Sequence, residues 1–309
     1  MRVFAIFLAV CLALFGGDLK PKKIIKLDSP ATDMTLQSSR LFACSANGDV
    51  YEIGDKPKKL YSLPHFTTPS GEKRAQKAFS LAVSPSLDTF VIAAEDGRLY
   101  IGKNGIVKQS GFSTNSVIKK VALLSDNLAL IGLVSSQVTL FDISKNRAIY
   151  STQIGSSPFS DMALSPDKKS LATVGEAGFV YILDAASGKQ KALYKNVNLD
   201  NIYKVDYQNG ALITAGQDRR ATFLTDKGVV KTRFDADFLV YSVALSPLAS
   251  KAAVAINDQN DIAIFDTLTK SKVATAKGHN ATLNRIVFLN ETEFASSADE
   301  NKILIWGIK

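Results

Sequence analysis

A short apolar motif recurs seven times along this chain, and no other feature of the sequence constrains the fold as strongly. The copies occupy residues 33–36, 80–85, 120–124, 161–166, 204–207, 242–247 and 285–289. Each copy is followed by a polar stretch rich in turn-forming residues. The third residues of the copies lie 38 to 47 residues apart, so one unit repeats along the chain. A unit of this size cannot bury both of its faces alone, and neighbouring units must therefore stack.

The last unit shows how each repeat is built. Strand patterns at 283–289, 293–297 and 302–306 are separated by short polar turns, the second of them at 299–301. Apolar runs bounded by Asn, Asp and Glu are typical of an antiparallel meander. The third strand pattern also recurs in the other units, for example at 137–142 and 261–266. We therefore predict an all-β chain, with no long helix after the N-terminal region.

The last unit begins with Gly278 and His279, ends with Trp306, and carries the acidic turn residues Asp299 and Glu300 in between. In this it resembles a WD40 repeat, the four-stranded blade of a β-propeller with a period of about 40 to 45 residues. The resemblance implies seven blades and a structural hydrogen-bonded chain that links the histidine, an acidic turn residue and the tryptophan. Glu300 stands where the family has aspartate, and the other six units lack the Gly-His pair and the tryptophan.

The ring also needs a means of closure. The last unit supplies only three strands, whereas residues 22–27 form an extended, β-branched segment between Pro21 and Pro30. A bare strand edge would leave backbone groups unpaired, so we expect the N-terminal segment to join the C-terminal blade as its fourth strand. The prediction is one seven-bladed domain over residues 18–309.

Residues 1–17 differ from the rest, with Arg2, an apolar run at 3–15 and two glycines. This run is short for a membrane span and resembles the hydrophobic region of a signal peptide. We therefore predict a signal peptide over 1–17, a periplasmic protein and no stable membrane span, with lipidation of Cys11 as an alternative. Without the leader, Cys44 is the only cysteine, so no internal disulfide can form. We expect Cys44 to be a buried residue of a strand.

The formal net charge of +8 is spread over all units in short runs. Lysines on edge strands are an ordinary defence against aggregation, and no basic platform with interleaved aromatic residues is present. The charge therefore favours a soluble surface over nucleic-acid binding.

Motifs of known chemistry are missing. The sequence contains no Gly-rich phosphate loop after a strand, no His-Glu-x-x-His motif and no nucleophile elbow, and it has only two histidines. Asp33, Asp161 and Asp206 fall on first strands, which line the channel of a propeller, and could hold a calcium ion or act as a base. They lie in three different units with no shared partner residue in the sequence. We therefore expect no catalytic, cofactor-binding or metal-binding residues.

The connection at 64–78 makes the first repeat longer than the others and shows no strand pattern. Long connections in compact domains are often functional. Its side chains make it the candidate partner-binding loop, and the alternative is a mobile loop without a partner. The candidate residues are His65, Phe66, Lys73, Arg74 and Lys77.

As a whole, the short leader, the degenerate seven-unit ring and the high lysine content are similar to the NapL proteins encoded among periplasmic nitrate reductase genes of some bacteria. That resemblance implies an accessory role in reductase assembly or electron delivery, with a protein partner and no cofactor. We therefore predict an exported, monomeric, non-enzymatic protein-interaction scaffold. A propeller hydrolase of the lactonase type and a cytosolic WD40 scaffold remain as alternatives.

Overall fold

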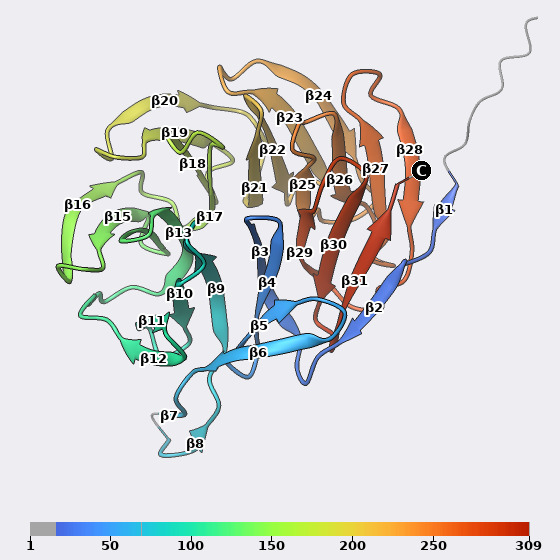
Figure 1. The fold of residues 1–309 in the computed structure, drawn as a ribbon. Coiled ribbons are helices and arrows are strands. Elements are labelled where there is room, and N and C mark those ends of the chain that lie inside the picture. Colours follow the sequence, from blue (N-terminus) through green and yellow to red (C-terminus); the bar gives the residue numbers. More distant parts are fainter. Residues whose placement is uncertain (1–16, 69, 309) are drawn as a thin grey trace, which may run out of the picture.

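A computed structural model of this chain describes residues 17–68 and 70–308. Over these residues the backbone forms strands and turns but no helix. Seven sheets stand as blades around a central axis, so the fold is a seven-bladed β-propeller (Figure 1). The all-β propeller predicted from the repeat is thus confirmed.

The first three blades follow the chain in order. Blade 1 contains β3 (Ala31–Gln37), β4 (Arg40–Ser45), β5 (Asp49–Ile53) and β6 (Pro57–Ser62). Blade 2 contains β9 (Ala78–Val83), β10 (Thr89–Ala94), β11 (Leu99–Lys103) and β12 (Ile106–Gln109). Blade 3 contains β13 (Ile118–Ser125), β14 (Leu128–Leu133), β15 (Gln137–Asp142) and β16 (Arg147–Gln153).

The other four blades complete the ring. Blade 4 contains β17 (Phe159–Leu164), β18 (Ser170–Gly175), β19 (Val180–Asp184) and β20 (Gln190–Tyr194), and blade 5 contains β21 (Ile202–Gln208), β22 (Ala211–Gly216), β23 (Arg220–Thr225) and β24 (Val230–Asp235). Blade 6 contains β25 (Val243–Leu245), β26 (Lys251–Ala255), β27 (Ile262–Asp266), β28 (Lys272–Ala276) and an added strand, β1 (Asp18–Leu19). Blade 7 contains β29 (Leu283–Phe288), β30 (Glu293–Ala298), β31 (Lys302–Gly307) and β2 (Lys23–Lys26).

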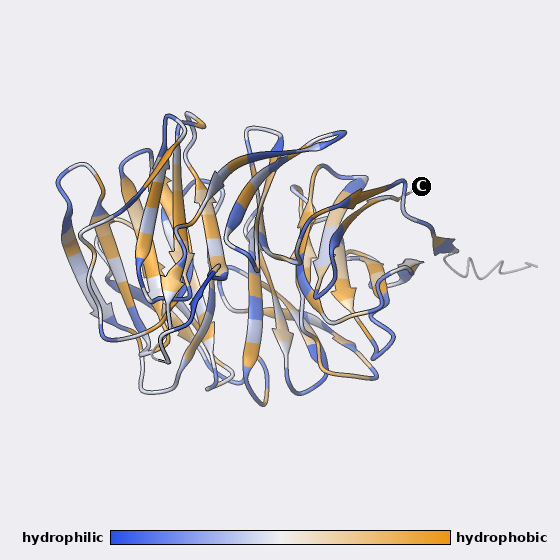
Figure 2. Cartoon of the chain, turned by 90° about the horizontal axis from the view of Figure 1, so that it is seen from below, coloured by the Kyte–Doolittle hydropathy of each residue, from blue (hydrophilic) through white to orange (hydrophobic). Residues whose placement is uncertain are grey.

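The hydrophobic core lies between neighbouring blades rather than at the centre of the ring. Second strands are covered on both faces, and all six residues of β10 are buried. Between blades 1 and 2, the ring of Phe42 meets the ring of Phe90 edge-on, with centroids 5.5 Å apart. Cys44 is buried in the same cluster, as predicted. Figure 2 shows the resulting apolar stripes along the strands, with polar residues gathered at their ends.

The ring closes as the sequence predicts. Strand β2 pairs antiparallel with β31, and Ile25 lies opposite Ile303. Ile25 is buried at 4% exposure, whereas Ile24 on the other face is 55% exposed. The N-terminal strand is therefore the outer strand of the C-terminal blade.

Strand β1 was not predicted. Asp18 and Leu19 pair parallel with Thr275 and Ala276 of β28, so the outer edge of blade 6 carries a fifth strand. A two-residue strand has no periodicity that a sequence pattern could reveal.

The connection after blade 1 also differs from its prediction. It holds a short hairpin of β7 (Phe66–Thr67) and β8 (Lys73–Arg74), so the expectation that this segment lies outside every strand was wrong. A turn that contains Gly71 at a φ of 89° closes the hairpin, and Thr68 N–H bonds to the carbonyl of Glu72. Because glycine adopts positive φ without strain, Gly71 suits this turn.

The predicted leader falls outside the described residues except for Gly17, and so does Cys11. Among the residues that are described, no helix is long and apolar enough to cross a membrane.

Candidate functional site

The hydrogen-bonded chain implied for the last blade is present. Trp306 Nε1 donates to Ser296 Oγ at 2.7 Å, and His279 contacts Ser296 Oγ through Nε2 and Glu300 Oε1 through Nδ1, each at 2.6 Å. Burial lowers the pKa of His279, although Glu300 opposes this effect. The neutral imidazole then donates from Nδ1 to Glu300 and accepts the Ser296 hydroxyl at Nε2.

Glu300, rather than Asp299, is therefore the acidic member of this chain. Asp299 accepts a hydrogen bond from Asn284 Nδ2 at 2.9 Å instead. Gly278 lies directly against the indole, since a Cβ at this position would come within 3.3 Å of Trp306. Trp306 has no exposed surface, so these residues are placed to hold the blade together.

Ser296 joins the histidine to the tryptophan and was not among the residues predicted from the sequence. It lies on β30, next to Ser297, and is fully buried. The one sign of this residue in the sequence is a small polar side chain at a strand position where an apolar side chain would be expected.

The centre of the ring is polar. The residue that begins each motif copy occupies the same place on the innermost strand of its blade, or just before it in blade 6. These seven central residues are Asp33, Ser80, Lys120, Asp161, Lys204, Ser242 and Arg285.

Asp33 makes more side-chain hydrogen bonds than any of the other six. Its Oδ2 accepts from Lys120 Nζ at 2.6 Å, Ser80 Oγ at 2.8 Å and the Leu81 amide at 3.2 Å. Burial by itself would raise the pKa of Asp33, but the cations Lys120, Arg285 and Lys204 outweigh it and lower that pKa to about 2. Asp33 thus joins three blades as a carboxylate.

Arg285 corrects the expectation that the channel acids share no partner. Its Nη1 lies 3.5 Å from Asp161 Oδ2, and its Nε lies 3.8 Å from Asp33 Oδ1. Arg285 comes from blade 7 and Asp161 from blade 4, so the guanidinium extends across the channel. The sequence could not show this, because residues in different blades meet only once the ring has closed.

Asp206 lies on β21, two residues after the central residue Lys204. Its two oxygens accept the amides of Tyr207 at 2.9 Å and Leu245 at 2.8 Å, and burial raises its pKa. Asp206, Gln208 and Arg285 line a cavity of 370 Å³ at one mouth of the channel. In the described part of the chain, no three His, Cys, Asp or Glu side chains are grouped as metal ligands.

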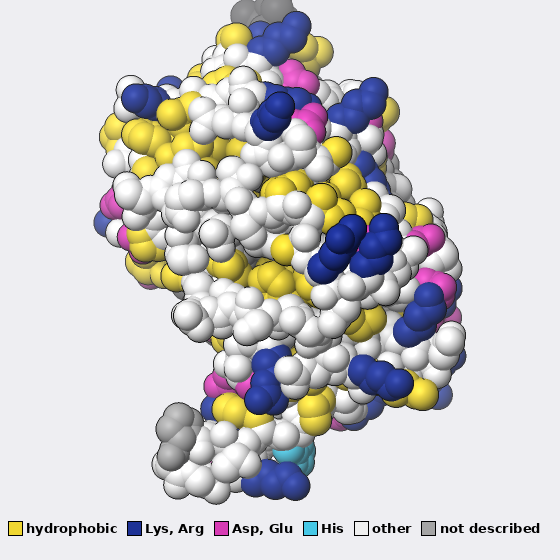
Figure 3. All heavy atoms as spheres, turned by 90° about the vertical axis from the view of Figure 1, so that its left-hand side faces the viewer, with side chains coloured by type: hydrophobic (Ala, Val, Ile, Leu, Met, Phe, Trp, Pro, Cys, Tyr) yellow, Lys and Arg dark blue, Asp and Glu magenta, His cyan; other side chains and the backbone are white. Residues whose placement is uncertain are grey.

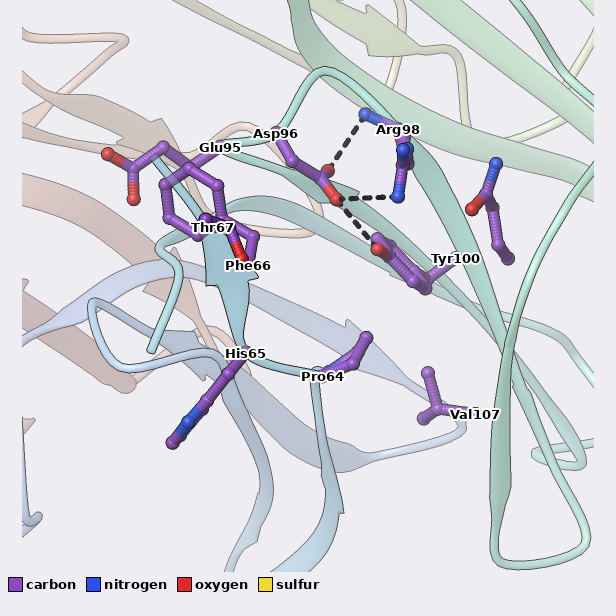
Figure 4. A pocket seen from close by; sticks show the side chains of 10 residues that line it. Pro64, His65, Phe66, Thr67, Glu95, Asp96, Arg98, Tyr100 and Val107 are labelled. Atoms are coloured by element: carbon purple, nitrogen blue, oxygen red, sulfur yellow. Dashed lines mark hydrogen bonds and ion pairs between the residues drawn. The ribbon is translucent and has the colours of Figure 1, made fainter. Parts of the chain in front are cut away.

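A larger cavity lies at the rim, between the β7–β8 hairpin and blade 2. This hairpin cleft has a volume of 790 Å³. Figure 4 shows Pro64, His65 and Phe66 on the hairpin side, opposite Asp96, Arg98 and Tyr100 of blade 2. In the space-filling view the hairpin projects from the body of the ring as a separate lobe (Figure 3).

Arg74 fixes the hairpin to blade 2. Its two terminal nitrogens bond to the two carboxylate oxygens of Glu95, at 3.1 and 2.6 Å, and its guanidinium lies 4.9 Å from the ring centre of Phe66. The buried Gln76 adds a bond from Nε2 to the carbonyl of Pro64 at 2.7 Å. Bidentate Arg–carboxylate pairs hold a defined geometry, so the hairpin forms a fixed wall.

The five predicted loop residues therefore divide into two groups. Arg74 is engaged with Glu95, and Lys77 donates its backbone N–H to Glu95 while its ammonium lies 6.0 Å from the ring centre of Phe79. His65 and Lys73 are exposed, and Phe66 is half-buried at the cleft.

The opposite wall is also ordered by hydrogen bonds. Tyr100 donates its hydroxyl to Asp96 Oδ2 at 2.7 Å, and Arg98 Nη1 lies 3.8 Å from the same oxygen. Val107 and Gln109 of the outer strand β12 complete this wall. The cleft thus combines aromatic and aliphatic surface with groups already held in place.

Fold and site together define a seven-bladed β-propeller with a structured cleft at its rim. No protein-family model matches the chain, and no curated protein matches it.

Proposed function

We propose that this chain is a protein-interaction scaffold that holds a protein partner in the hairpin cleft. The observation that carries the proposal is the hairpin itself, a departure from the blade repeat that is fixed to blade 2 by the Arg74–Glu95 pair. A wall that is already ordered loses little conformational entropy on binding, which favours affinity.

The composition of the cleft supports the same proposal. Phe66 and Tyr100 offer aromatic surface at the opening, with Arg98 beside them. Aromatic residues and arginine contribute most of the binding energy at many protein interfaces. Because the cleft is open to solvent rather than enclosed, it suits a protein segment better than a small molecule.

The finer proposal is that the scaffold is exported to the periplasm and serves as an accessory protein of a periplasmic nitrate reductase, in assembly or electron delivery. It rests on the resemblance to NapL proteins and on the sequence of residues 1–17. Under this proposal the partner is the reductase or one of its electron donors.

The test is a two-residue variant of the cleft, Phe66→Ala with Lys73→Glu, which keeps Arg74 in place. The tagged parent and variant are expressed in cells that naturally produce the protein, and bound proteins are recovered and quantified. We expect the variant to recover much less of the partner than the parent does. The amount recovered should also depend less on salt concentration, because salt screens the charge that Lys73 contributes.

The matched control is Leu268→Ala with Lys270→Glu, in the turn between β27 and β28, where Leu268 is 87% exposed. It removes one exposed apolar group and one lysine far along the ring. Equal recovery of the partner by the parent and the cleft variant would contradict the proposal.

A further inference from the structure

Among the described residues, the outer strand of blade 2, β12, pairs on one edge only, with β11, and its other edge is open. Its residues pair with β11, with Ile106 opposite Lys103 and Lys108 opposite Ile101, and the Ser110 amide bonds to the Leu99 carbonyl in the same ladder. Backbone groups alternate in direction along a strand, so those of Val107 and Gln109 face outward. They can pair with a further strand.

Hollows lie on both sides of this edge. Val107 lines the hairpin cleft, whereas Ile106 and Lys108 line a second cavity of 480 Å³ between blades 2 and 3, and Gln109 borders both. Ile143 of blade 3 contributes to that second cavity, and Ile106 is an exposed apolar residue. Because side chains alternate along a strand, a strand paired with β12 would direct its side chains into both hollows in turn.

The chain itself shows that an outer edge of this ring accepts a further strand. Strand β1 lies along β28 of blade 6, as described above. Blade 2 has no such strand among the described residues.

The charges around β12 favour an acidic partner. In the described residues the acids of the cleft already have cations beside them, Glu95 with Arg74 at 2.6 Å and Asp96 with Arg98 at 3.8 Å. Among the described residues, the neighbouring Lys103 pairs with Asp88 at 3.3 Å, whereas Lys108 lines the second cavity, whose lining contains no Asp or Glu. The local excess of charge is therefore positive.

We propose that the partner binds by strand addition, with an extended acidic segment paired to β12 and apolar side chains in the two hollows. This inference rests on the proposed function, since it names the mode of binding at the same cleft. Main-chain hydrogen bonds to Val107 and Gln109 provide affinity, and the hollows and Lys108 provide specificity.

The probe is a phage library of random peptides of about ten residues, long enough for one strand. It is selected on the intact protein, and enriched peptides are measured by fluorescence anisotropy. We expect the enriched peptides to be rich in Glu or Asp and to lack central prolines. Within each peptide, the acidic residues should alternate with apolar residues. Binding should protect the amides of β12 from hydrogen exchange.

Val107→Pro is the decisive variant, because it removes an outward N–H and keeps the ladder with β11. We expect it to weaken the enriched peptides at least about tenfold. The control is Arg233→Pro, which removes an outward N–H from the outer strand β24 of blade 5 and should leave binding unchanged. Should Val107→Pro fail to fold, Lys108→Glu changes the charge without touching the backbone and should also weaken binding.

Strand addition would be overturned if the enriched peptides bound Val107→Pro as tightly as the parent protein. If Val107→Pro does not fold, equally tight binding to Lys108→Glu would overturn it. So would a failure to enrich acidic peptides. The proposed function has a separate test, because a native partner that is lost from the Phe66→Ala/Lys73→Glu variant but retained by Val107→Pro would support the cleft and reject the strand. A partner retained by both variants would reject the cleft as well.

Discussion

At the scale of single residues, Ser296 explains how one blade is fixed from within. It accepts the indole N–H of Trp306 and donates to His279, so two buried polar groups depend on a single hydroxyl. None of these atoms faces the hairpin cleft. This hydrogen-bonded chain therefore stabilises the last blade, and it lies apart from the proposed binding site.

Ser296→Ala should reduce the free energy of unfolding by about 1 to 3 kcal/mol, because it leaves buried nitrogens of His279 and Trp306 without partners. Trp306→Ala should cost more, about 3 to 5 kcal/mol, because it removes a large buried ring. Urea denaturation measures both. A folded Ser296→Ala protein with unchanged stability but lost partner binding would turn this structural residue into a site residue.

Asp33 makes the free energy of unfolding depend on pH in the acid range. Its pKa of about 2 in the folded protein lies below the unfolded value near 4, so its contribution is complete above pH 4 and is lost as the pH falls to 2. A shift of this size corresponds to about 2 kcal/mol. In Asp33→Asn this part of the acid dependence should be absent when melting is followed from pH 6 to 2. An unchanged profile would show that Asp33 is not the group responsible.

Lys120→Met should destabilise the protein more than Asp33→Asn, by about 3 to 5 kcal/mol, because it removes the ammonium that lies 2.6 Å from the buried Asp33 carboxylate and leaves, among the described residues, only the more distant Arg285 as an ion-pair partner. The double variant Asp33→Asn/Lys120→Met should recover part of that loss. Thermal melting of all three proteins at neutral pH measures the coupling. Strictly additive effects would argue against a direct pair between the two side chains.

At the scale of elements, strand β2 links the two ends of the described chain, and its two isoleucines offer a matched comparison. Ile25→Asp should destabilise the protein strongly because it places a carboxylate in the core between blades 1 and 7, whereas Ile24→Asp on the exposed face should change little. Deletion of residues 20–27 should lower thermal stability further. Similar melting temperatures for the two aspartate variants would contradict the closure seen here.

The length of a strand decided whether it could be predicted from the sequence. Strands of the repeated unit carry enough alternating or apolar residues to be found by pattern, and the bare edge of the last blade required β2 to complete it. Strands β1 and β7 have two residues each and no pattern at all. They form because their backbone groups find an edge or a turn partner, which depends on the folded neighbourhood.

The candidate site divides in the same way. His65 and Phe66 were found from a connection that was too long for its blade, and both line the cleft. Glu95 and Tyr100 lie within an ordinary blade and gave no signal, although they hold the hairpin and form its opposite wall. Arg74 was found for its charge, but the structure uses that charge to fix the hairpin.

At the scale of the whole molecule, the interactions that join the blades lie in a different region from the proposed binding site. The channel is occupied by charged side chains that join blades across the centre, such as Arg285 with Asp161. The rim instead carries the one hairpin among the described residues that lies outside the blades, and an open strand beside it. Under the proposed function, binding at the rim would leave the interactions in the channel intact.

Site-specific photocrosslinking tests this account most directly. A photoreactive amino acid is placed at exposed His65 in the hairpin cleft, and in a second protein at Leu268 in blade 6, and each is irradiated in cells that naturally produce the chain. If the partner binds in the hairpin cleft, position 65 should yield one dominant crosslinked protein, less of it when Phe66→Ala/Lys73→Glu is also present, and position 268 should yield little. A partner captured equally from both positions, or only from position 268, would contradict it.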